Sequence, residues 1–270
     1  MSGEAAAAGT AAPGGIAAPA AVAVTRDDWS ELRRHTPARI ALGRAGAGLP
    51  TAEVLRLGLA HAQARDAVQL PLDVDVLDAA LRRAGFATLR AESAAPDRAA
   101  YLLRPDLGRR LSERTEAALR GAGVPPCDLL LVIGDGLSSL GVARHAVPLA
   151  EAIRGALPAG WTLGPVVVAT QARVALGDDI GAALGARLVA VLIGERPGLS
   201  SPDSLSVYLT RAPRRGCSDA ERNCVSNIRP EGLGVAAAAR KVRWLCEEAE
   251  RIGATGVRLK DRSDAHSVED

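Results

Sequence analysis

The sequence predicts an α/β fold, in which a doubly wound, mainly parallel sheet follows a small helical domain. Three uninterrupted apolar runs support this prediction, because such runs are typical of strands covered on both faces. Helical stretches separate the runs, and strands that alternate with helices imply βαβ units. The runs are CDLLLVIGDG from Cys127, PVVVAT from Pro165 and RLVAVLIGE from Arg187.

Residues 1–25 consist largely of Ala, Gly and Pro and predict a disordered N-terminal tail. The segment has neither a basic beginning nor a leucine-rich stretch, so it does not fit a signal peptide. Chain ends tolerate such extensions. A tail without a role and a short targeting or docking peptide therefore both remain open.

Residues 26–124 predict a helical domain without strands. A Gly/Pro loop, TPARIALGRAGAGLPT, leads to Thr51, whose hydroxyl can cap the helix that follows. That helix places Leu55 and Leu59 on one face. Two further helices end at glycines. Their apolar positions are Val74, Leu77 and Leu81 for the first, and Leu107, Leu111 and Leu119 for the second.

Residues 125–270 form the predicted α/β domain. Helices are expected in LSSLGVARHAVPLAEAIRGAL and VALGDDIGAALGA, between the apolar runs, and a fourth strand is expected in LSVYLT. A long final helix starts near Val235 and carries one apolar stripe, which indicates packing on the core. The stripe consists of Val235, Ala239, Val242, Leu245, Ala249 and Ile252.

The composition excludes several classes of function. The formal net charge is only +2, and the chain has one Phe, two Tyr and three Trp. A nucleic-acid binder usually shows a basic stripe, often with stacking aromatic residues. We therefore expect no nucleic-acid partner. The four cysteines form no C-x-x-C pair, so we expect reduced thiols and no metal site. No run of about 18 apolar residues is present to cross a membrane.

Three strand ends carry candidate ligand loops. In open α/β sheets, ligands bind at the carboxyl ends of the strands. The loops are Gly134-Asp135-Gly136, the segment from Ala169 to Val174, and the segment that starts at Glu195. A glutamate after a strand can equally be a solvated turn residue. The convergence of three such loops favours a ligand crevice.

The glycines of the first loop leave two alternatives open. Gly134, Gly136 and Gly141 come near the dinucleotide-binding pattern G-x-G-x-x-G without matching it. No acidic residue stands about 20 positions on, after a second strand, where the ribose would need it. A tight strand-to-helix turn explains the same glycines.

The sequence offers no complete set of catalytic residues. It contains no G-x-S-x-G nucleophile elbow. In the α/β half only His145 and His266 are histidines, and we expect His145 to be a partly exposed structural residue in a helix. Without a nucleophile, a base or a metal site, the chain is expected to hold a ligand as a subunit rather than to act alone.

Four ordered blocks closely resemble the small (light) subunit of ethanolamine ammonia-lyase over residues 30–260. They are TPARIALGRAGAGLPT, LLLVIGDGLSSLGV, ARVALGDDIGAALGARLVAVLIGERPGLSSPDSLSVYLT and ERNCVSNIRPEGLG. The resemblance implies a Rossmann-like domain and a radical, adenosylcobalamin-dependent lyase that converts ethanolamine to acetaldehyde and ammonia. It also implies a barrel-shaped large subunit with the catalytic residues, a hetero-oligomer with several copies of each subunit, and a cytoplasmic location, free or within a bacterial microcompartment.

The resemblance also implies three cobalamin contacts. They are Val174 in ARVALGDDIG, Glu195 in IGERPGL and Cys224 in NCVSNIRP. Val174 offers packing, and Glu195 can accept hydrogen bonds from the amides of the corrin or from the nucleotide loop. Cys224 is expected to pack against the cofactor without binding cobalt, and a buried structural thiol is its alternative.

One absence bears on how cobalamin would be bound. Cobalamin proteins that replace the lower base by histidine carry the pattern D-x-H-x-x-G. The only D-x-H here is Asp264-Ala265-His266, and Glu269 takes the place of the glycine. We therefore expect the cofactor to keep its own benzimidazole. Two other functions remain as alternatives: a nucleotide-binding oxidoreductase and a non-catalytic assembly protein.

Overall fold

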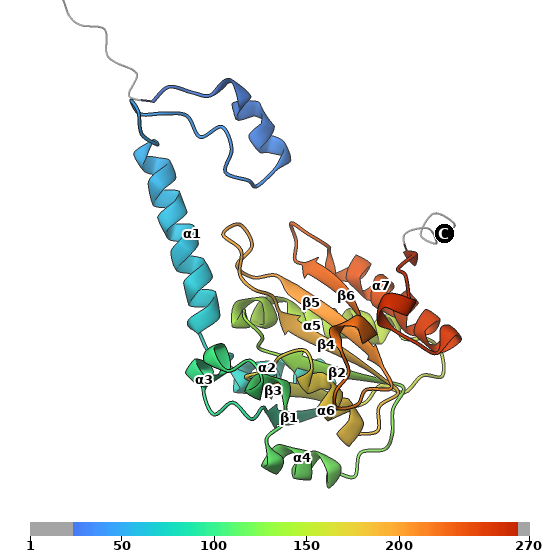
Figure 1. Cartoon of the computed structure of the whole chain (residues 1–270). Helices are drawn as coiled ribbons and strands as arrows, with labels where there is room; N and C mark the ends of the chain where they lie inside the picture. The colour runs from blue at the N-terminus through green and yellow to red at the C-terminus, as the bar shows by residue number, and fades with distance from the viewer. Residues whose placement is uncertain (1–23, 264–270) are drawn as a thin grey trace, which may run out of the picture. The chain divides into compact units, whose positions relative to one another are not determined.

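The structure is a computed structural model that describes residues 24–263 (Figure 1). Almost all of the predicted disordered tail, and the Asp264-Ala265-His266 motif, lie outside the described residues. The chain divides into two compact units, Met1–Gly58 and Leu59–Asp270. No helix among residues 24–263 is both long and apolar enough to cross a membrane.

The first unit contains a short helix and the beginning of a long one. Asp27 caps the short helix by accepting the backbone N–H of Trp29 at 2.9 Å. The long helix begins at Thr51, one residue earlier than predicted, so the residue before it is Pro50, whose carbonyl faces the first turn. That carbonyl accepts the backbone N–H of Glu53 at 2.9 Å. Thr51 is thus the first helical residue.

The helices of the described chain include four short 3-10 turns. The α-helices are α1 (Thr51–Gln69), α2 (Val74–Arg83), α3 (Arg98–Leu103), α4 (Glu113–Arg120), α5 (Ser139–Ala156), α6 (Leu176–Ala183) and α7 (Val235–Ile252). The 3-10 turns are η1 (Asp28–His35), η2 (Leu107–Arg109), η3 (Asp219–Glu221) and η4 (Gly256–Arg258).

The second unit is built on a six-stranded sheet with the order β1-β3-β2-β4-β5-β6. The strands are β1 (Thr88–Glu92), β2 (Leu129–Gly134), β3 (Val166–Thr170), β4 (Leu188–Gly194), β5 (Leu205–Arg211) and β6 (Arg222–Ile228). The strands from β1 to β4 pair in parallel, and β5 and β6 pair antiparallel. The predicted α/β fold is confirmed, with a mixed sheet.

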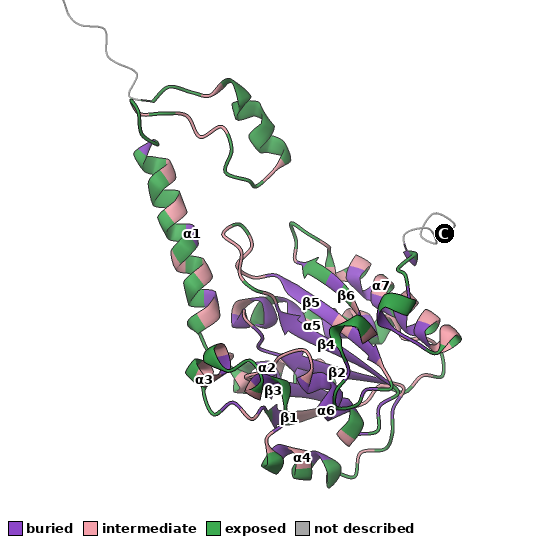
Figure 2. Ribbon diagram, viewed as in Figure 1, coloured by how far each residue is buried: buried purple, intermediate pink, exposed green. Residues whose placement is uncertain are grey.

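Helices cover both faces of this sheet. Leu129, Leu131 and Ile133 of β2 pack into a core with α2, α5 and α7, whereas Leu130 and Val132 pack towards α4 and α6. Figure 2 shows the central strands buried along their length. This explains why nearly every residue of these strands is apolar. The predicted stripe of α7 packs on the first of these cores.

Two strands and one helix differ from the sequence predictions. The region predicted to be only helical contains β1, which pairs with β3 from Thr88↔Val166 to Glu92↔Thr170. Its sequence, TLRAE, does not show the apolar pattern of a buried strand, because β1 is an edge strand with charged, exposed positions. The edge strand β6 escaped prediction because its exposed residues, Cys224, Ser226 and Asn227, leave no apolar run in the sequence. The predicted third helix is also shorter: α4 begins after Ser112, whose hydroxyl accepts the backbone N–H of Thr115 at 3.3 Å.

The connections after β2 and β3 leave the sheet towards opposite faces, and this places a crevice at the carboxyl ends of the two strands. The helix after β2 is α5, which lies on one face of the sheet, and the helix after β3 is α6, which lies on the other face. Neighbouring strands whose connections leave to opposite faces form an opening at their carboxyl ends. The predicted ligand loops all start at this edge.

Candidate functional site

A pocket of about 200 Å³ lies at the carboxyl ends of β2, β3 and β4. It brings together two of the three predicted site residues, Val174 and Glu195. Loops after all three strands contribute, as does α3. The lining residues are Tyr101, Gly136, Leu137, Arg173, Val174, Ile193, Gly194, Glu195, Arg196, Ser206 and Tyr208.

Asp135 joins the loops that follow β2 and β3. Its buried carboxylate accepts the backbone N–H groups of Gln171 at 3.0 Å and Ala172 at 2.8 Å. The guanidinium of Arg98 contacts the same carboxylate at 3.3 Å and also donates to the carbonyl of Gly136 at 2.9 Å. Burial raises the pKa of Asp135, and these donors oppose that rise. Asp135 therefore holds the loops after β2 and β3 together beneath the surface of the pocket.

The glycines of the first loop make room for neighbouring backbone. A Cβ on Gly136, which has a φ of +56°, would lie 2.3 Å from the Gly194 carbonyl oxygen. A Cβ on Gly141 would lie 2.6 Å from the Ser204 carbonyl oxygen. These approaches require glycine whether or not a ligand binds. The turn interpretation thus explains Gly136 and Gly141 without a dinucleotide.

Tyr101 forms the buried wall of the pocket. Its side chain is 0% exposed, and its hydroxyl donates to the Ala172 carbonyl at 3.1 Å. The guanidinium carbons of Arg98 and Arg173 lie 4.7 and 4.3 Å from the ring centroid, within cation–π range. Burial raises the pKa of Tyr101 to about 12, so the phenol stays neutral at physiological pH. Sequence reasoning missed this residue because α3 is remote along the chain.

The carboxylate of Glu195 is held by three donors, from the residue before β5, from β5 and from β6. The hydroxyls of Ser204 and Ser206 each donate to one of its oxygens, and the backbone N–H of Asn227 donates to Oε1 at 2.8 Å. Oε1 thus has two protein donors and Oε2 has one. Because a carboxylate oxygen accepts about two hydrogen bonds, Oε2 keeps one acceptor position for a ligand.

Cys224 lies beside the pocket rather than in its lining. It is on the edge strand β6, opposite Tyr208 of β5. The residue is exposed in this chain, so the alternative of a buried structural thiol is wrong. Partial desolvation of the sulfur by the surrounding protein nevertheless raises the pKa of the Cys224 thiol, which favours its neutral form. Its position allows contact with a ligand that extends from the pocket across β5 and β6.

Comparison with known proteins gives the family. The sequence profile described as "Ethanolamine ammonia-lyase light chain (EutC)" matches residues 26–260. The chain belongs to the ethanolamine ammonia-lyase light-chain family. The ethanolamine ammonia-lyase small subunit of Azotobacter vinelandii is 55% identical over 247 residues, which cover 89% of this chain and 90% of the relative. That of Ralstonia nicotianae is 53% identical over 253 residues, which cover 91% and 93%. The resemblance drawn from the sequence is thereby confirmed.

One further prediction about this light-chain family member can be compared with the structure. His145 was expected to be partly exposed, but it is buried in α5, with Nε2 3.7 Å from a carboxylate oxygen of Asp203. The expectation failed because α5 packs its length against the sheet and α7. Within residues 24–263, no group of three or more His, Cys, Asp or Glu side chains is arranged to hold a metal ion.

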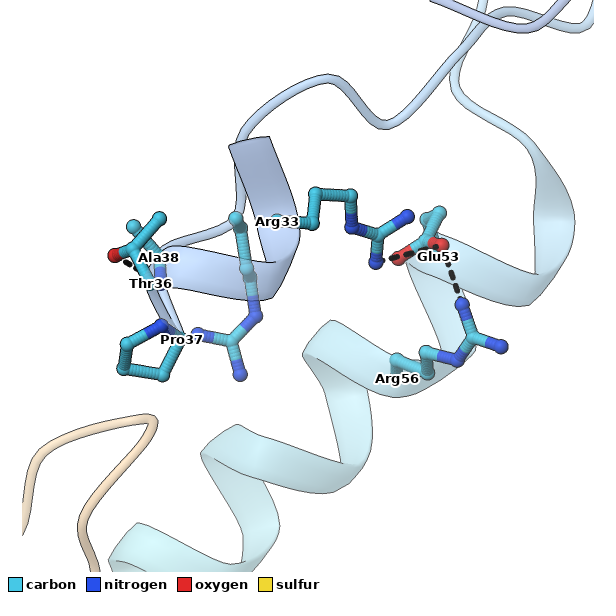
Figure 3. Close-up of a pocket in the computed structure, with 7 residues that line it drawn as sticks. Arg33, Thr36, Pro37, Ala38, Glu53 and Arg56 are labelled. Atoms are coloured by element: carbon cyan, nitrogen blue, oxygen red, sulfur yellow. Dashed lines mark hydrogen bonds and ion pairs between the residues drawn. The ribbon is translucent and has the colours of Figure 1, made fainter. Parts of the chain in front are cut away.

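A second pocket, of about 300 Å³, lies within the first unit and contains no predicted site residue. Figure 3 shows Glu53 between two arginines, Arg33 and Arg56, and the Arg33 contact is 3.5 Å long. Both guanidinium groups are substantially exposed. Exposed ion pairs of this kind contribute little stability. We therefore take the pocket at the sheet edge as the candidate site.

Proposed function

We propose that this chain is the small subunit of an adenosylcobalamin-dependent ethanolamine ammonia-lyase, which converts ethanolamine to acetaldehyde and ammonia. In this proposal the chain holds cobalamin at its interface with a large catalytic subunit. The observation that carries the proposal is the shared pocket of Val174 and Glu195 at the sheet edge, with Cys224 on the adjoining strands.

The residues of the pocket fit a corrin. A corrin has an apolar face and a fringe of amide side chains, which need both donors and acceptors. Glu195 keeps one acceptor position for the N–H of such an amide. Leu137, Val174 and Ile193 supply apolar contact.

The size of the pocket supports a division of labour between two chains. Pockets that enclose a small molecule usually measure about 300–1,000 Å³. A pocket of about 200 Å³ can cradle only part of a cofactor as large as cobalamin. We infer that the large subunit covers the remainder, excludes water and supplies the substrate site.

The chemistry would come from the cofactor. When bound, adenosylcobalamin supplies a radical by homolysis of its cobalt–carbon bond. The role of this chain is to bind and orient the corrin. Val174 packs against it, Glu195 accepts from an amide N–H, and Cys224 packs at its edge. We further propose a Rossmann-like cofactor domain, a role in ethanolamine catabolism, a hetero-oligomer with several copies of each subunit, and a cytoplasmic location, free or within a bacterial microcompartment.

Equilibrium binding of adenosylcobalamin to the co-purified subunits tests the proposal. Replacement of Val174, Glu195 and Cys224 together by Trp should weaken binding by about tenfold or more, because bulky groups remove the complementary surface. A matched control is Val257→Trp, at an exposed position in η4. Unchanged binding by the triple variant would overturn the proposed site. Ethanolamine turnover by this chain alone would overturn the division of labour.

A further inference from the structure

Two arginines of the pocket have N–H groups that the protein does not use. Nε of Arg173 is buried and has no hydrogen-bond partner in the described chain. One of its terminal nitrogens reaches the Tyr101 carbonyl at 3.3 Å, and the Tyr101 ring stacks against the guanidinium. Arg196 is exposed in the loop after β4 and forms no hydrogen bond or ion pair with residues 24–263.

The charge of the pocket is not balanced by its own acidic residue. Glu195 is the one carboxylate in the lining, against the two guanidinium groups of Arg173 and Arg196. Two serine hydroxyls and a backbone N–H already bind the Glu195 carboxylate, and within residues 24–263 it forms no hydrogen bond or ion pair with either arginine. The tyrosines of the lining are neutral, because burial raises the pKa of both Tyr101 and Tyr208 to about 12.

Uncommitted guanidinium groups at the end of an α/β sheet favour an anion with several oxygens. The planar fork of arginine presents paired N–H groups that match a phosphate, and such charge-assisted bonds are stronger than neutral ones. The stacking of Arg173 on Tyr101 holds one fork in place, which lowers the entropy lost on binding. Arg196 lies on the loop after β4, which β2 separates from β3, and it can approach the same anion from the other side of the end of β2.

We propose that Arg173 and Arg196 form a phosphodiester subsite, which rests on the proposed cobalamin function and takes the phosphate of the nucleotide loop. The amides of the corrin are neutral and do not call for two guanidinium groups. The nucleotide-loop phosphodiester carries a negative charge and two free oxygens, one for each arginine. A free phosphate or another phosphate ester has the same chemistry, so the test must separate these sources.

The test compares two ligands that differ in this phosphate. Cobalamin contains the nucleotide loop, whereas cobinamide lacks the loop and its phosphate. Equilibrium dialysis with the co-purified subunits would measure the affinity of each ligand for wild type, Arg196→Gln and the double variant with Arg173→Gln. Arg83→Gln is the control, because Arg83 is exposed at the end of α2, outside the pocket.

We expect the double variant to bind cobalamin about tenfold or more weakly and cobinamide unchanged. Arg196→Gln alone should show a smaller loss in the same direction, and because Arg196 is exposed this variant keeps the fold. If wild type binds neither ligand, the proposed function itself fails. If wild type binds both and the variants weaken both equally or neither, the subsite is wrong while the function stands.

Competition by inorganic phosphate tests whether the arginines bind the phosphate of the nucleotide loop or a different phosphate. We expect phosphate to compete with cobalamin in wild type and not with cobinamide. Suppose instead that phosphate binds wild type but not the double variant, while the variant keeps full affinity for cobalamin. The arginines would then bind a different phosphate, and the assignment to the nucleotide loop would be overturned.

Discussion

The carboxylate of Asp135 accepts the backbone N–H of Ala172 at 2.8 Å, and this bond ties the end of β2 to the end of β3. The Ala172 carbonyl in turn accepts the hydroxyl of Tyr101 at 3.1 Å. One short stretch of backbone thus connects two strand ends and the buried wall of the pocket. The pocket is held by groups that lie behind its surface, which is how a binding site is kept in shape before a ligand arrives.

Asp135→Asn is expected to lower the free energy of unfolding by about 1–3 kcal/mol, because buried donors lose their partner. An amide has a single acceptor oxygen, so one of the two N–H groups of Gln171 and Ala172 is left unpaired. The midpoint of urea unfolding would measure the loss. The exposed Asp66→Asn is the control and should change stability by less than about 0.5 kcal/mol. Equal effects of the two substitutions would show that Asp135 does not organise the loops.

Gly194→Ala is expected to be destabilising by about 1–3 kcal/mol through overpacking. A Cβ at Gly194 would lie 2.1 Å from the Ser138 carbonyl oxygen, so the loops after β2 and β4 would have to separate. Gly155→Ala offers a contrast. Gly155 lies in α5, and its added Cβ would meet nothing within 4 Å. That substitution should be stabilising by up to about 1 kcal/mol, because alanine favours a helix. Thermal unfolding of both variants would test the difference in sign.

The buried strands could be predicted from the sequence, and the edge strands could not. In β2, β3 and β4 both faces pack against helices, so nearly every residue is apolar and the run stands out. In β1 the side chains of Arg90 and Glu92 are exposed, and their charges are compatible with an edge position alone. The pairing of β1 with β3 spans a long stretch of chain, and such a contact leaves no local pattern.

The candidate site was predictable only in part, for a related reason. Val174 and Glu195 could be selected because each follows a recognisable strand, and the carboxyl ends of parallel strands meet at one edge. Tyr101 comes from α3, and Tyr208 lies within β5 rather than at its end. Their place in the pocket depends on tertiary packing. No spacing rule connects them to the loops that they face.

The buried ion pair of Asp178 and Arg222 is expected to make stability depend on pH. The two side chains meet at 2.6 Å, and each is 2% exposed. Burial raises the pKa of Asp178 to about 7, although Arg222 opposes this rise. An aspartate in an unfolded chain has a pKa of about 3.9. The folded state therefore binds the proton more tightly, so the stability contributed by this group is complete below about pH 4 and is lost as the pH rises through about 7.

Urea unfolding of wild type and Asp178→Asn between about pH 4 and about pH 8 would measure this dependence. We expect the free energy of unfolding of wild type to fall with pH relative to the variant, and the difference to level off above about pH 7. The variant itself should be less stable at low pH, because its amide cannot reproduce the hydrogen bonds of the carboxyl group. Parallel profiles over the whole range would contradict the raised pKa.

Ser206→Ala is expected to weaken cobalamin binding without a large loss of stability, if Glu195 contacts the cofactor as proposed. The Ser206 hydroxyl is one of two donors to Oε1 of Glu195, and its removal leaves the Asn227 N–H alone on that oxygen. A carboxylate with fewer hydrogen-bond donors around it samples more orientations. The loss of one such hydrogen bond corresponds to about 1 kcal/mol, or about a fivefold lower affinity for cobalamin. Glu195→Gln should lower the affinity for cobalamin more, because the amide nitrogen cannot accept a hydrogen bond.

The double variant tests whether Ser206 acts through Glu195 or directly on the ligand. If Ser206 acts through Glu195, adding Ser206→Ala to Glu195→Gln should change the affinity for cobalamin little further. Additive losses of affinity would mean that Ser206 acts on the ligand independently.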